Sequence, residues 1–123
     1  MISNKLELIL NSAIRKANEL KHEFLTIEGV LLAMVKEDAT VRDVLEDCDA
    51  DLNIVETDLD QFLSQDDKFS ILSDEEIEEL SDKQFVNDEM RELAKANGVT
   101  YQPEISMALQ RVIQRAALHV QSS

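Results

Sequence analysis

Apolar residues recur every third or fourth position through the first twenty residues of this chain. They are Leu6, Ile9, Leu10, Ala13, Ile14, Ala17 and Leu20. In an α-helix this spacing places them on one face, so the pattern predicts an amphipathic helix over residues 3–21. The chain has only two glycines and one proline, and it has no alternating β-branched runs. We therefore expect an all-α fold.

Three more helices are expected before residue 65. Thr26 is a good N-cap for the second helix, with Glu28 in its first turn near the positive end of the helix dipole. Thr40 is the candidate cap of the third helix, and Asp51 that of the fourth. Because the connections are short, residues 1–65 are predicted to form a compact bundle of four helices.

Residues 66–102 form an acidic segment, which we interpret as a partly helical, partly mobile insert or linker. Eleven acidic and three basic residues lie between positions 66 and 92. The few apolar residues look too sparse for the main core. Ser73 and Glu76 have the spacing of a capping box, and Gly98 is expected to stop a helix near residues 85–97.

Residues 103–123 are predicted to form one further helix, beginning at Pro103. Its apolar stripe is expected to face inward and comprises Ile105, Leu109, Val112, Ile113, Ala116 and Val120. At a constant offset of 99, this helix matches the first one, for example Leu10 with Leu109. We interpret it as the first helix of a second repeat that is cut short. An exposed apolar stripe must be buried against another surface, so self-association of the fragment is an open alternative.

Charge and cysteine content narrow the possible function. The formal net charge of −14 argues against binding to nucleic acid or anionic membranes. No apolar run is long enough for a transmembrane helix, and the N-terminus lacks the pattern of a secretory signal. The single cysteine, Cys48, allows no internal disulfide, and we expect it to be buried. These features predict a cytoplasmic protein.

His22 and Glu23 could open a zinc-protease motif, but that motif needs a second histidine where Thr26 stands. The other histidine, His119, lies in the last predicted helix. We therefore assign no metal site, and a joint site of His22, Glu23 and His119 stays as a less favoured alternative.

Two other chemical motifs lack residues that they require. Residues 47–51 resemble the start of a calcium loop, but Leu52 occupies the position where the loop needs glycine. Glycines occur only at 29 and 98, which excludes a phosphate-binding loop, so no cofactor is assigned to this segment. No catalytic constellation remains, and we do not expect the segment to be an enzyme.

Two stretches resemble a known family. LELILNSAIRKANELKHEFLTIEGVLLAM is similar to the N-terminal domain of Clp-type AAA+ unfoldases, most closely the ClpA branch. QRVIQRAALHVQSS is similar to the opening of the second repeat of that domain. The resemblance covers roughly residues 1–65 and 103–123. It implies two pseudo-repeats of four helices on a hexameric, ATP- and Mg²⁺-dependent unfoldase that feeds the ClpP peptidase.

The resemblance also implies a function for this domain, which hydrolyses nothing itself. Such domains dock protein substrates and, in the ClpA branch, the adaptor ClpS. The residues that match the adaptor-facing surface are Glu23, Thr26 and Glu28, and Ser106 lies near a further contact. In the ClpC branch, the residue that matches Glu28 helps to bind phosphorylated arginine.

Two alternatives to the docking domain stay open. A free-standing regulator of the same fold could compete for ClpS, and a longer reading frame with a phosphate-binding loop would separate the two. A metal-binding protein is the more distant alternative. One departure from the family is clear: Gly29 and Val30 stand where it has histidine and leucine, and glycine inside a helix costs about 1 kcal/mol relative to alanine.

Overall fold

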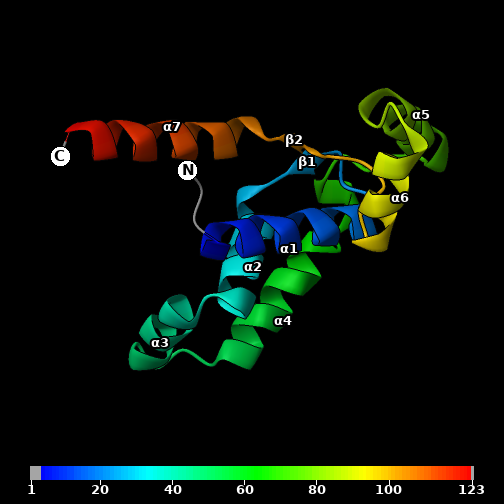
Figure 1. The fold of residues 1–123 in the computed structure, drawn as a ribbon. Helices are drawn as coiled ribbons and strands as arrows, with labels where there is room; N and C mark the ends of the chain where they lie inside the picture. The colour runs from blue at the N-terminus through cyan, green and yellow to red at the C-terminus, as the bar shows by residue number, and fades with distance from the viewer. Residues whose placement is uncertain (1–3, 123) are drawn as a thin grey trace.

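A computed structural model of the chain describes residues 4–122, with the side chains of residues 4–119 (Figure 1). The elements are α1 (Asn4–Leu20), β1 (Phe24–Leu25), α2 (Ile27–Glu37), α3 (Ala39–Asp47), α4 (Leu52–Leu63), the 3-10 turn η1 (Asp66–Lys68), α5 (Asp74–Gln84), α6 (Asp88–Ala96), β2 (Glu104–Ile105) and α7 (Met107–Ser122). Helices dominate and the only sheet of the described residues has two short strands, which confirms the all-α class.

The core lies where α1 packs on α2, and α2 in turn packs on α3 and α4. Ile9 and Ala13 of α1 are buried against Ala33 of α2 and Leu25 of β1. Alanine on both helices lets their backbones approach closely, so this interface is tight rather than bulky. The predicted stripe of α1 is therefore largely confirmed, although Leu6 at its N-terminal end is exposed.

The helix ends follow the predicted caps with one exception. Thr26 caps α2 and Asp51 caps α4, each through its side-chain oxygen, and Ser73 opens α5 with a complete capping box. The prediction for α3 was wrong, because Asp38 rather than Thr40 is its N-cap. The Asp38 carboxylate accepts the N–H groups of Thr40 and Val41, and it also pairs with Lys5 at 3.0 Å.

The acidic segment contributes more to the core than its composition predicted. Leu72 is buried and Tyr101 is fully buried, with no exposed surface. Leu72 donates its N–H to the Lys21 carbonyl at 2.8 Å, next to an antiparallel bridge between His22 and Ile71. Both ends of the segment are therefore fixed to the chain around β1. The predicted helix near 85–97 is α6, which is followed by Gly98 at φ 78°, as expected for a glycine stop.

Ser81 shows how α5 adds to this packing. It is buried on the inner side of an otherwise acidic helix. The helix ends where Phe85 donates its N–H to the Ser81 carbonyl. An acidic side chain at this buried position would be unfavourable, because its charge would be removed from water without a partner.

The last helix begins later than predicted. Pro103 is not its first residue: β2 pairs with β1 in parallel, and α7 begins only at Met107. The predicted inward stripe is also wrong for most of its described length, because Leu109 is buried whereas Val112 and Ile113 are each about half exposed. Figure 1 shows the reason, since α7 extends away from the other helices. Val120, the last residue of that stripe, lies outside the residues whose side chains are described.

Cys48 differs from expectation too. It is exposed at the C-terminal end of α3, a peripheral helix with no buried residue. None of the described helices is long and apolar enough to cross a bilayer.

Candidate docking site

The short parallel sheet brings two distant segments to one edge of the molecule. Phe24 lies opposite Glu104 and Leu25 opposite Ile105. The Glu104 N–H donates to the Glu23 carbonyl at 3.1 Å, and the Ser106 N–H donates to the Leu25 carbonyl at 3.0 Å. Each strand is followed by a residue with a hydroxyl group and then by a helix. Ser106 therefore lies beside the strand that leads into Thr26.

Thr26 and Ser106 have the same local role. The Thr26 Oγ1 accepts the Gly29 N–H at 3.2 Å, and the Ser106 Oγ accepts the Leu109 N–H at 3.2 Å. Each hydroxyl satisfies a donor that the first turn of its helix leaves without an intrahelical partner. The two helices α2 and α7 thus start side by side, each from a capped N-terminus.

Glu28 lies in the first turn of α2 and is half-buried. Its carboxylate has no hydrogen bond or ion pair with any other described residue. This carboxylate lies near the positive end of the α2 dipole. Glu28 and Glu104 are therefore carboxylates of this edge that have no side-chain partner among the described residues.

Glu23 is held in place rather than directed to open solvent. Its carboxylate accepts the Ser70 hydroxyl at 2.6 Å, and its N–H donates to the Ser70 carbonyl at 2.9 Å. Ser70 is thus a residue of the site that sequence reasoning missed. Nothing in the sequence marks it, because the contact depends on the bridge between His22 and Ile71.

His22 is a buried residue with a structural role. Its buried ring stacks on Phe69 at 4.5 Å, and its Nε2 lies 3.1 Å from the Leu63 carbonyl. Desolvation by burial lowers the pKa of His22, against the opposing effects of the Leu63 hydrogen bond and of Asp66. The neutral ring can still donate Nε2–H to the carbonyl.

The candidate metal ligands are not brought together. His119 lies on α7, whereas the His22 ring stacks on Phe69. Within the described part of the chain, no three histidine, cysteine, aspartate or glutamate residues are placed to hold a metal ion. Asp51, from the calcium-like stretch, uses its carboxylate to cap α4.

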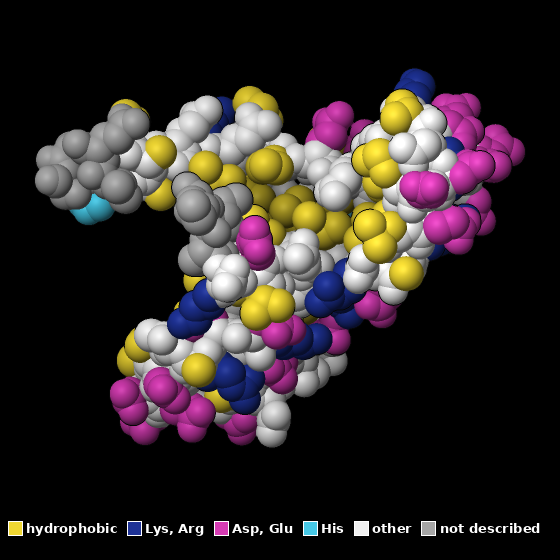
Figure 2. Space-filling view, in the orientation of Figure 1, with side chains coloured by type: hydrophobic (Ala, Val, Ile, Leu, Met, Phe, Trp, Pro, Cys, Tyr) yellow, Lys and Arg dark blue, Asp and Glu magenta, His cyan; other side chains and the backbone are white. Residues whose placement is uncertain are grey.

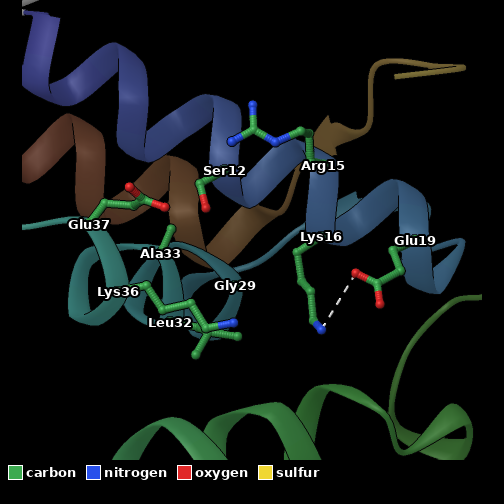
Figure 3. A pocket seen from close by; sticks show the side chains of 9 residues that line it. All are labelled: Ser12, Arg15, Lys16, Glu19, Gly29, Leu32, Ala33, Lys36 and Glu37. Carbon is green, nitrogen blue, oxygen red and sulfur yellow. Dashed lines mark ion pairs between the residues drawn. The ribbon is translucent and has the colours of Figure 1, made fainter. Parts of the chain in front are cut away.

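A pocket of about 260 Å³ opens between α1 and α2, beside Gly29 (Figure 3). Lys16 lines it and pairs with Asp60 at 2.7 Å and with Glu19 at 3.6 Å. Burial lowers the pKa of Lys16, but the hydrogen bond and charge of Asp60, with a smaller effect of Glu19, outweigh it and raise the pKa. The remaining charged groups of the lining are Arg15, Lys36 and Glu37. Since positive and negative groups nearly balance, the pocket selects neither anions nor cations.

The fold and the candidate docking site define the class of this protein. It is a small all-α domain in which two short parallel strands each lead into a helix with a capped N-terminus. A family model described as the Clp repeat (R) N-terminal domain matches residues 1–78, and the chain belongs to that family. The family was expected from the stretch around HEFLTIEGVLLAM, and the match confirms it.

Within the family, the chain is similar to ClpA. It is 34% identical over 121 residues to a protein of Fuscovulum blasticum named "ClpA homolog protein". The matched region covers 98% of this chain but 12% of that protein, so the chain corresponds to a small part of the relative's length.

Proposed function

We propose that this chain is the adaptor- and substrate-docking domain of a ClpA-like ATPase subunit that works with ClpP in ATP-dependent protein degradation. The family match and the similarity to the named relative support the proposal that the parent protein is a ClpA-like ATPase subunit. One geometric observation carries the docking assignment. The β1–β2 pairing brings Ser106, which is far away in sequence, beside β1 and so close to the stretch that contains Glu23, Thr26 and Glu28.

This edge suits a partner with a basic group and hydrogen-bonding capacity. Glu28 supplies a negative charge with no described partner, and the Thr26 and Ser106 hydroxyls retain acceptor and donor capacity after capping. An exposed ion pair contributes at most about 1 kcal/mol, so the carboxylates orient the adaptor more than they hold it. Ile27 and Leu31 of α2 are exposed nearby and supply apolar contact area.

ATP and Mg²⁺ belong to the proposed parent protein rather than to this segment. The two glycines of the chain lie inside α2 and directly after α6, so they form no loop that cradles phosphate. The residues described here therefore do not fit a nucleotide, and no step of nucleotide chemistry is assigned to them.

Titration calorimetry with the organism's ClpS tests the proposal. The double variant Glu23→Lys, Glu28→Lys is expected to bind more weakly than the wild-type chain, because two negative charges that attract a basic partner become positive charges that repel it. A matched control, Asp43→Lys with Glu46→Lys, changes the net charge equally on the exposed face of α3. The control is expected to bind like the wild type, apart from a small effect of net charge.

Circular dichroism first establishes that both variants are folded. An equal loss of binding in the control variant would show that net charge alone explains the effect, and it would contradict a specific binding site at this edge. Undiminished binding by the Glu23→Lys, Glu28→Lys variant would contradict the assignment of the binding site to these residues. No binding by the folded wild-type chain would contradict docking of this adaptor by the segment.

A further inference from the structure

Glu23 is held between two stretches of chain, one at each end of the acidic segment. Its N–H donates to the Ser70 carbonyl at 2.9 Å, and its carbonyl accepts the Glu104 N–H at 3.1 Å. Both backbone groups of Glu23 are therefore paired, each with a residue far away in sequence. Because the backbone is fixed at this point, the orientation of the carboxylate depends on the side-chain torsions alone.

Ser70 also restrains the side chain of Glu23. The Ser70 hydroxyl donates to one oxygen of the Glu23 carboxylate at 2.6 Å, a short distance of the kind that a charged acceptor gives. No other residue of the described chain forms a hydrogen bond or ion pair with this carboxylate. The second carboxylate oxygen is therefore left as an acceptor for a basic group of a partner.

A second short pairing beside β1 brings Ser70 to Glu23. Residues 70–72 run antiparallel to residues 21–23, through the bridge between His22 and Ile71 and the hydrogen bond from the Leu72 N–H to the Lys21 carbonyl at 2.8 Å. His22 and Leu72 are both buried. This pairing therefore holds the Ser70 backbone beside Glu23 whether or not residue 70 has a hydroxyl group.

The charges along the acidic segment show why a serine suits this position. Residues 69–73 carry no charge, whereas the next helix, α5, is rich in aspartate and glutamate, and Figure 2 shows acidic side chains gathered over it. An acidic side chain at position 70 would repel the Glu23 carboxylate, whereas a hydroxyl group donates a hydrogen bond to it. The acidic segment therefore meets Glu23 through a neutral donor.

We propose that Ser70 is a positioning residue of the candidate docking site, which holds the Glu23 carboxylate in one orientation before the adaptor binds. A side chain that is already ordered loses less conformational entropy on binding, so the restraint increases affinity without any contact between Ser70 and the adaptor. Ser70 matters to the adaptor only if Glu23 does, so this role rests on the proposed function. It also gives the acidic segment a part in the site.

Nuclear magnetic resonance of the free chain tests the restraint itself. In the wild type, the two γ-protons of Glu23 should have distinct chemical shifts, because the side chain keeps one orientation. In Ser70→Ala the two shifts should converge as rotamers interconvert, whereas in Ser70→Thr, which keeps a hydroxyl group, they should stay distinct. Converged shifts in the wild type, or unchanged shifts in Ser70→Ala, would overturn the restraint.

Titration calorimetry with ClpS tests the effect of the restraint on binding. Ser70→Ala is expected to weaken binding about threefold, because the Glu23 side chain must then be ordered when the adaptor binds. Ser70→Thr should bind like the wild type. Ser64→Ala is the matched control, since it removes a serine hydroxyl that donates to the Asp60 carbonyl at the end of α4, and it should also bind like the wild type.

A double-mutant cycle separates positioning from a general effect on structure. In a Glu23→Ala background, Ser70→Ala should cause no further loss of affinity, because no carboxylate remains to be oriented. The same loss in both backgrounds, or no loss in Ser70→Ala when Glu23→Ala does weaken binding, would overturn the positioning role and leave the proposed function intact. Binding that Glu23→Ala leaves unchanged would instead contradict the proposed use of Glu23 by the adaptor, and the role of Ser70 in docking would be overturned with it.

Discussion

Removing a single oxygen atom from Tyr101 tests how the acidic segment is held to the rest of the domain. The fully buried Tyr101 hydroxyl lies 2.6 Å from the His22 carbonyl and 3.1 Å from the Ala17 carbonyl. Tyr101→Phe keeps the buried ring and deletes only these contacts. Any change in stability therefore reports the hydrogen bonds rather than a cavity.

The size of the effect depends on which carbonyl loses its partner. The Ala17 carbonyl still accepts the His22 N–H at 2.9 Å. The His22 carbonyl, in contrast, has the Tyr101 hydroxyl as its one partner among the described residues. Leaving one buried acceptor without a partner costs about 1–3 kcal/mol. We expect Tyr101→Phe to lower the free energy of unfolding by about 2 kcal/mol.

Urea unfolding followed by circular dichroism measures this difference. Tyrosine fluorescence is unsuitable, because the chain has no tryptophan and Tyr101 is its single tyrosine. The midpoint should fall while the dependence on urea stays the same, since the surface exposed on unfolding does not change. A loss below about 0.5 kcal/mol, smaller than a single net hydrogen bond, would refute the reasoning.

Three further results are expected. Burial raises the pKa of Tyr101 to about 12, so the free energy of unfolding should fall as pH rises from about 10 toward 12, and this fall should be absent in Tyr101→Phe. Burial lowers the pKa of His22, so the free energy of unfolding should fall as pH drops below about 6.5, where the unfolded chain binds the proton more readily. The urea midpoint should therefore fall between pH 7 and 5 in the wild type and depend less on pH in His22→Gln. The same dependence of the midpoint on pH in both proteins would contradict this. Gly29→Ala should raise the free energy of unfolding by about 0.5–1 kcal/mol, because the added Cβ would lie an ordinary 3.5 Å from Thr26 Oγ1; a decrease measured by urea unfolding would contradict that fit.

Local signals in the sequence predicted much of the fold. The spacing of apolar residues located α1 to within a residue of the observed ends at Asn4 and Leu20. Thr26, Asp51 and Ser73 were identified as caps, because capping depends on contacts within a few residues. Thr40 failed as a cap because Asp38, two residues earlier, is an equally good one and gains a second contact with Lys5.

The spacing of apolar residues could not predict contacts between residues that are far apart in sequence. Tyr101 is isolated in an acidic stretch, and its burial depends on carbonyls of Ala17 and His22 far away in sequence. The parallel pairing of β1 with β2 delays the start of α7, since Ile105 joins a strand that periodicity assigned to a helix. Two-residue strands carry too little periodicity to be recognised.

The candidate site was predicted only in part. Thr26 and Ser106 were named as contact residues, and the structure gives both a capping role beside the same strand pair. The restraint on Glu23 by Ser70 was not predicted, because it depends on how residues 70–72 return to the edge of β1. The adaptor role of all four residues stays a prediction.

The adaptor edge is tested most directly by nuclear magnetic resonance of the isotope-labelled chain, which is small enough at 14.0 kDa for residue-by-residue assignment. Unlabelled ClpS is added, and the amide shifts of the chain are followed. The account predicts that the largest changes occur at Thr26, Glu28 and Ser106 together, since these residues lie on one edge. Changes confined to α3 and α4, with this edge undisturbed, would contradict it.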